Sequence, residues 1–472
     1  MPIWASSCSR VWLPALRYTS PQRCYSTVQR VNVTCASSGS ISVHLHNVDQ
    51  HHASHPLIIW IPPFPQEPGS SHSDPAALLP SWLQQFPTAV INYRWAGLRQ
   101  RETRTGGESP DEAAPPSPLH WPAPIHDVLF GYSWIQKHLT PPDPIKRDIY
   151  ICSSYLGASL AAGLALTESH SSEKTAVRGL INFNGIYNWT TFLPDHPINK
   201  PKSTKKGILS APFRSVEPDE NQSLFPLLRQ QAPVLFNTPE HLFDPFASAC
   251  FFFHSADLLV PTDFHTPATP SAMTQAIDAL SSSSSSQTNK MPGEFPPVPP
   301  IMEKPPRKGY LTFPPRQSSL VLPSTLLLHE TTPPTAPRLK GKGKGRPKAS
   351  LRFGGKYTGE NNFDTQANEL AAYMKRSINM FELKQRVKWD GEEEDDNDDG
   401  GVSTDEAEQR VQVKDVGLLS SENLDAAFGP VGCADDGDGE GGKAQGVIKD
   451  GGDFGLTAQG QEMVAEWLED RM

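Results

Sequence analysis

The chain has 472 residues, of which 47 are proline and 34 are glycine, and it carries a formal net charge of −10 at pH 7. This length accommodates one large α/β domain, and the proline and glycine content indicates that much of the remainder is linker. Part of the negative charge comes from one acidic run at 392–399, so the charge does not define a class of partner. No uninterrupted apolar stretch approaches the ~18 residues of a membrane span, so we expect none.

The N-terminal segment has the composition of a mitochondrial targeting sequence. Residues 1–48 contain no Asp or Glu but carry four arginines among Ser, Leu, Trp and Cys. A matrix presequence is basic and amphipathic, and Arg23-Cys24-Tyr25-Ser26 resembles the cleavage pattern of such presequences. We therefore predict a transit peptide over 1–25 and localisation in the mitochondrial matrix. A basic tail without a targeting role is the alternative.

The six cysteines form neither a Cys-x-x-Cys pair nor a regular series. This pattern argues against a zinc site or a disulfide framework and suits a reducing compartment. We expect no metal and no cofactor.

The first predicted elements form a hairpin of two alternating segments, 31–35 and 41–45, around a Ser-Ser-Gly turn. His44 and His46 then share one strand face, with three more histidines close behind them at 51, 52 and 55. Metal binding is conceivable, but no carboxylate or cysteine joins the group. We therefore expect solvated histidines at a strand end.

The next apolar run, 57–61, predicts a buried strand that leads into Pro62-Pro63-Phe64-Pro65. Residues 89–94 predict another strand, 99–118 a polar and proline-rich loop, and 122–134 a helix. The order of short apolar strands and helices indicates an α/β fold with a parallel sheet.

The most informative stretch lies at 148–167. Residues 149–152 are apolar or β-branched, which is typical of a buried parallel strand, and the Ala-rich residues after 157 have helical spacing. A tight turn between such a strand and such a helix is the context of a nucleophile elbow, G-x-S-x-G. Here the turn has Ser153-Ser154-Tyr155-Leu156-Gly157, so Tyr155 takes the place of the nucleophilic serine.

These residues resemble the α/β-hydrolase superfamily, in particular the esterase/lipase branch related to hormone-sensitive lipase. The small-residue helix start at 157–162 and the helix at 122–134 also resemble that branch, although small residues can occur at the turn of any βα unit. The resemblance implies a mostly parallel central sheet with helices on both faces. It also implies a single domain over 26–472, interrupted by disordered inserts at about 264–320, 335–360 and 390–452.

The rest of the chain supplies further elements in the order expected for such a domain. Strands are predicted at 177–182, 322–330 and, as an edge, 381–387, and helices at 363–378 and 456–472. The inserts contain a run of six serines, a proline cluster, a glycine-spaced basic segment at 338–348 and the acidic run at 392–399. Such compositions bury too little apolar surface to offset chain entropy, so we expect disorder there.

The resemblance also locates the expected catalytic groups, and each is altered. The nucleophile position holds Tyr155, and the loop that supplies oxyanion donors holds Pro62, Pro63 and Phe64, where proline lacks an N–H group. The acid is expected near Thr332 or Pro333, and the histidine position is taken by Asp453 or by nothing equivalent. Acyl transfer requires these groups to act together, so the sequence predicts a pseudoenzyme that binds a protein partner or a small apolar ligand.

Two other interpretations remain open. An active carboxylesterase or lipase-like hydrolase could use Ser154 or Ser153 if the turn has another register, with Asp257 as acid and His329, His254 or His265 as base. The plainer roles for these residues are turn, cap and buried polar positions. An RNA-associated protein could use the basic segment 338–348, but no aromatic residues alternate with its lysines, so a solvated linker is favoured and nucleic acid is an unfavoured partner.

Overall fold

The structure is a computed structural model, and it describes residues 28–65, 79–95, 119–199, 224–265, 306–331, 361–383, 401–418 and 456–472. The predicted transit peptide, the basic segment 338–348, the acidic run 392–399, and the positions Thr332, Pro333 and Asp453 lie outside these residues.

The fold is built on a sheet of eight strands in the order β1-β2-β4-β3-β5-β6-β7-β8. The strands are β1 (Val28–Thr34), β2 (Ser40–His46), β3 (Leu57–Ile61), β4 (Thr88–Asn92), β5 (Arg147–Ser154), β6 (Thr175–Phe183), β7 (Ser324–Thr331) and β8 (Val411–Leu418). β1 and β2 form the predicted hairpin, β2 pairs antiparallel with β4, and all other pairs are parallel. This order and the mostly parallel pairing are those of the α/β-hydrolase fold, which confirms the predicted fold class.

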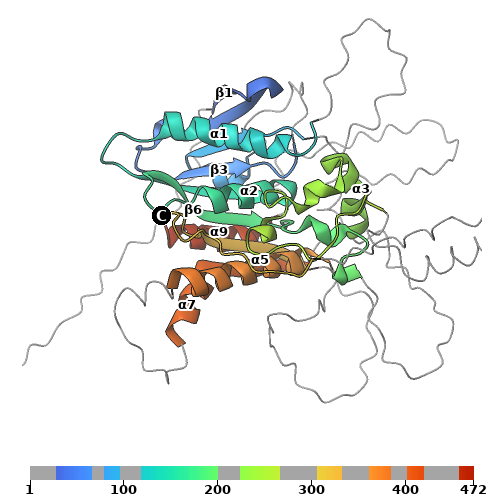
Figure 1. The fold of residues 1–472 in the computed structure, drawn as a ribbon. Coiled ribbons are helices and arrows are strands. Elements are labelled where there is room, and N and C mark those ends of the chain that lie inside the picture. Colours follow the sequence, from blue (N-terminus) through green and yellow to red (C-terminus); the bar gives the residue numbers. More distant parts are fainter. Residues whose placement is uncertain are drawn as a thin grey trace, which may run out of the picture.

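Helices cover both faces of the sheet (Figure 1). They are α1 (Ala123–Leu139), α2 (Tyr155–Thr167), α3 (Leu224–Phe236), α5 (Phe363–Ser377), α7 (Gly401–Arg410) and α9 (Ala458–Glu469). Two residues of β6 show the two faces, because the Asn182 side chain donates to the Ala158 carbonyl of α2 whereas a Cβ on Gly179 would point at Trp467 of α9. No helix among the described residues is long and apolar enough to cross a membrane.

β5 and the helix that follows it, α2, are both buried, because each is surrounded by apolar side chains. Residues 149–154 of β5 are all buried, as the continuous apolar run predicts. Nearly every residue of α2 is buried too, and its alanines and glycines allow neighbouring elements to approach closely. α5 instead is amphipathic, and Asn362 caps its N-terminus by accepting a hydrogen bond from the Thr365 N–H at 2.8 Å.

An ion pair between the half-buried Arg94 and the buried Asp127 fixes the end of β4 against α1. Asp127 is fully buried, and its carboxylate accepts hydrogen bonds from Arg94 Nη2 at 2.6 Å, Arg94 Nε at 2.9 Å and the Arg94 N–H at 3.0 Å. Such charge-assisted, bidentate contacts are among the stronger hydrogen bonds in proteins. They hold the end of β4 in one position against α1.

Two predicted elements near the C-terminus are wrong. The sequence predicts an edge strand at 381–387, but residues 378–383 continue α5 as a π-helix. This conformation buries both Ile378 and Leu383, which are five residues apart, in the core. The predicted insert at 390–452 contains α7 and β8, so residues 401–418 are ordered elements of the fold. The predicted insert at 264–320 is likewise too long, because Tyr310 and Leu320 form β-bridges and Phe313 is buried. Val411, Val413 and Val416 give β8 enough apolar surface to pair with β7.

The prediction of solvated histidines on β2 is also wrong. His44 is 5% exposed and His46 is 1% exposed. Burial, with help from Arg30 and His46, lowers the pKa of His44 to about 4. The His44 ring is therefore neutral in the folded protein near pH 7.

Candidate active site at the elbow

Tyr155 lies at the apex of the turn between β5 and α2. Its φ of 49° is left-handed, whereas Ser154 before it has extended backbone with φ −146° and ψ 162°. A left-handed backbone costs energy for a residue with a bulky side chain, and this strained apex is the feature that defines a nucleophile elbow. The structure thus places the phenol, and neither serine, at the apex.

The Tyr155 ring is enclosed by aromatic side chains from three separate parts of the chain. Phe64 stacks on it with ring centroids 5.8 Å apart, and Phe183 and Phe363 meet it edge-on, each at 5.9 Å. The side chain is 2% exposed in consequence. The space next to the elbow apex, where an ester would have to approach an attacking group, is filled by the residue's own ring.

The hydroxyl end of Tyr155 meets a buried polar pair. Asn184 Nδ2 donates to the phenol oxygen at 3.4 Å and to Glu330 Oε2 at 3.0 Å, and the Glu330 N–H donates to Asn184 Oδ1 at 2.9 Å. Burial, and to a smaller degree the nearby Glu330 charge, raises the pKa of Tyr155 well above its usual value. A phenol that is harder to ionise than a free one is a weaker nucleophile.

The loop that would carry oxyanion donors instead presents carbonyl groups to the elbow. The Gly157 N–H, near the start of α2, donates to the Pro63 carbonyl at 3.3 Å. A Cβ on Gly157 would lie 2.3 Å from the Pro62 carbonyl oxygen, so this loop lies directly on the helix start. Oxyanion stabilisation needs free, preorganised donors, whereas the contacts that this loop makes with the helix start come from carbonyl oxygens, which can only accept hydrogen bonds.

The two serines before the apex have different environments. Ser153 Oγ donates to the Ile61 carbonyl at 2.8 Å, which ties β5 to β3. Ser154 Oγ is buried and has no hydrogen-bond partner. Among the described residues, no histidine is hydrogen-bonded to either hydroxyl.

The structure does not bring the other candidate groups to the serines. His329 Nε2 lies 3.3 Å from Asp364 Oδ1 at the start of α5, and its Nδ1 is buried without a partner. Asp257 lies in the loop near His254, whose Nδ1 contacts the Ser255 carbonyl at 2.9 Å. Burial and the charge of Lys308 lower the pKa of His254 to about 4. His265 is exposed.

No group of three or more His, Cys, Asp or Glu residues that could hold a metal ion occurs among the described residues. Cys35, Cys152 and Cys250 are free and buried, and burial raises the pKa of each thiol. The chemistry available at the elbow is therefore that of a neutral phenol, an amide and a carboxyl group.

Sequence reasoning missed Asn184 and Glu330 as parts of this site. Asn184 follows β6 and has a left-handed φ of 49°, which the Asn-Gly pair at 184–185 could have indicated. Glu330 falls at the end of the strand predicted at 322–330, where its position alone indicates no role in the site. Nothing local indicates their contact, because they are 146 residues apart in the chain.

No protein family matches this sequence, and no curated protein does. The structure is similar to EstE1, a thermostable carboxylesterase from a metagenomic library, at 14% identity and a TM-score of 0.29, over 49% of this chain and 65% of that one. It is similar to carboxyl esterase 2 of Tuber melanosporum (11%, TM-score 0.31, 67% and 70%) and to brefeldin A esterase, a bacterial homologue of human hormone-sensitive lipase (13%, TM-score 0.30, 50% and 59%). The aligned region thus spans less than two thirds of EstE1, and the fold is assigned from the strand order and the elbow.

Proposed function

We propose that this chain is a non-catalytic α/β-hydrolase-fold protein that acts by binding, in the mitochondrial matrix, rather than by hydrolysing esters. The observation that carries the proposal is the buried Tyr155 ring at the elbow apex, packed against Phe64, Phe183 and Phe363. Removing one member of a serine triad alone lowers turnover by several orders of magnitude. Here the apex group, its surroundings and the donor loop all differ from what acyl transfer needs.

Three contacts support this reading independently of one another. The phenol is held neutral by burial, the Gly157 N–H is occupied by the Pro63 carbonyl, and Ser153 is bonded to a backbone carbonyl. The first leaves no activated nucleophile at the apex, the second places the carbonyl groups of the proline-rich loop against the helix start, and the third engages the hydroxyl of one alternative serine. Retention of the scaffold then implies a role as a partner of another protein or as a holder of a small apolar ligand.

The mitochondrial part of the proposal comes from the N-terminal composition alone. It predicts that the full chain tagged at its C-terminus enters mitochondria and loses about 25 residues. A chain lacking residues 1–25 should stay outside them. An assembly role predicts a protein that co-purifies at stoichiometric amounts with the imported chain.

A serine-reactive fluorophosphonate probe tests the absence of hydrolysis. We expect no labelling of the purified full chain under conditions that label an active carboxylesterase completely. Labelling that disappears in Ser154→Ala or Ser153→Ala would refute the proposal and establish a serine hydrolase instead. Ser154→Ala and Ser153→Ala are the matched controls, because each removes one alternative nucleophile and leaves Tyr155 at the apex.

A further inference from the structure

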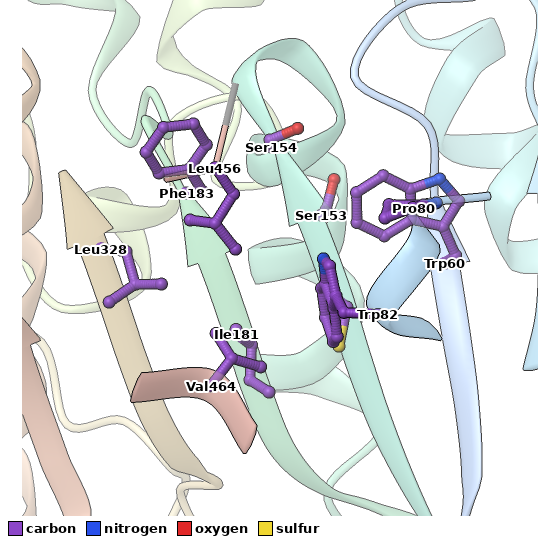
Figure 2. A pocket seen from close by; sticks show the side chains of 11 residues that line it. Trp60, Pro80, Trp82, Ser153, Ser154, Ile181, Phe183, Leu328, Leu456 and Val464 are labelled. Atoms are coloured by element: carbon purple, nitrogen blue, oxygen red, sulfur yellow. The ribbon is translucent and has the colours of Figure 1, made fainter. Parts of the chain in front are cut away.

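A small cavity lies beside the elbow on the face of the sheet that α9 covers. Its volume is about 20 Å³, which holds one water-sized group. Figure 2 shows its walls, with Leu328, Leu456 and Val464 on one side of β5, Trp60 and Pro80 on the other, and Trp82 over β5. Tyr155 is not among its lining residues, but Phe183, which packs on the phenol ring, is, so the cavity adjoins the aromatic enclosure of Tyr155.

Ser154 places in the cavity a hydroxyl group that the fold leaves without a hydrogen bond. Ser154 is 2% exposed, and its Oγ has no hydrogen-bond partner. A buried hydroxyl without a partner is unfavourable relative to one in water, so a group that could accept or donate a hydrogen bond there gains stability. Ser153, the neighbouring residue, has already used its hydroxyl on the Ile61 carbonyl.

The lining also limits the charge and shape of a ligand. The described residues that line the cavity include no charged side chain, so an ionised head group would lose its hydration without compensation. The walls are otherwise aliphatic and aromatic, which favours a hydrocarbon. The small volume admits only the tip of a ligand, and an unbranched end fits where a branched one does not.

We propose that this cavity is a binding subsite for a slim, neutral aliphatic molecule whose single hydroxyl or carbonyl group pairs with Ser154 Oγ. The terminal polar group enters the cavity between the buried Trp60 and Pro80 and Ser154, and the hydrocarbon extends outward past the half-buried Trp82. The proposal rests on the binding role proposed above and names the ligand class for it. Its test is separate from probe labelling, so the two can fail independently.

Titration of the full-length chain with 1-butanol, followed by ligand-observed NMR, tests this subsite. We expect saturable binding that Ser154→Ala weakens about fivefold, as the loss of one neutral hydrogen bond predicts. 1-Chlorobutane, which has no hydroxyl, should bind the wild type and Ser154→Ala equally. Val464→Ile adds one methylene group, comparable in size to the cavity, and should remove the binding.

Ser153→Ala is the matched control, because it removes a hydroxyl one residue away that is already bonded to the backbone. Its affinity for 1-butanol should equal that of the wild type. Circular dichroism establishes that each variant is folded before titration. Equal affinities of Ser154→Ala and the wild type would overturn the proposal, as would a cavity that holds only water and gives no saturable binding.

Discussion

Replacing Gly157 by alanine tests whether the proline-rich loop really lies against the start of α2. A Cβ at this position would be 2.3 Å from the Pro62 carbonyl oxygen, 2.5 Å from Ser153 Oγ and 2.9 Å from the Ile61 carbonyl oxygen. All three distances are shorter than real Cβ contacts, and two of the atoms are backbone, which cannot turn away. The loop or the helix start must therefore move.

The expected cost follows from two opposing effects. Forcing an extra carbon into a packed site destabilises by about 1–3 kcal/mol, and occasionally more. Alanine in place of glycine within a helix returns up to about 1 kcal/mol. Because two rigid carbonyls oppose the new atom, we expect Gly157→Ala to lower the free energy of unfolding by about 2 kcal/mol.

The matched control is Gly163→Ala in the same helix. There the nearest atom to a new Cβ is Cδ1 of the Phe246 ring at 3.0 Å, and a ring can shift by a few tenths of an ångström. We expect this variant to lie within about 1 kcal/mol of the wild type, because the helix gain offsets the contact. Urea unfolding followed by far-UV circular dichroism gives both values. Equal stability of the two variants would refute the close approach of the Pro62–Pro63 loop.

Three further predictions concern the buried groups. Tyr155→Ala should lower the free energy of unfolding by about 3–5 kcal/mol in urea denaturation, because it empties the aromatic enclosure, whereas Tyr155→Phe should cost about 1 kcal/mol or less; equal costs would contradict the packing. Asp127→Ala should cost about 1–3 kcal/mol, because Arg94 loses its carboxylate partner but stays partly exposed and keeps its hydrogen bond to the Ser38 carbonyl, and no measurable effect by thermal unfolding would argue against the pair. His44 and His254 have pKa values lowered from 6.5 to about 4, so the unfolded chain binds protons that the folded chain does not. Stability should therefore fall as pH drops from about 6.5 to 4, by up to about 3 kcal/mol for each ring, and a flat profile over this window would contradict their burial.

The sequence predicts most of this fold because its signals are local. The apolar run at 149–152 and the small residues around Tyr155 indicate a buried strand, a tight turn and a helix without knowledge of any partner. The hairpin and the strands at 57–61, 89–94 and 177–182 follow from the same short-range patterns. These elements are where the sequence and the structure agree.

The parts that the sequence does not predict depend on distant contacts. β8 shows only a weak alternation of apolar and polar residues, and it lies between charged and glycine-rich parts of the sequence. It completes the sheet by pairing with β7, from which it is separated by a long stretch of chain. The burial of His44 results from elements packed over β2, and polarity alone suggests the opposite. The contact of Asn184 with Glu330, likewise, forms only when β6 and β7 lie side by side.

Ester turnover by the purified full chain tests the central claim most directly. With p-nitrophenyl butyrate as substrate, we predict a rate no higher than that of the Ser153→Ala/Ser154→Ala double variant, because the apex group is a buried, neutral phenol. A wild-type rate well above that of the double variant would contradict the claim that this elbow no longer supports hydrolysis.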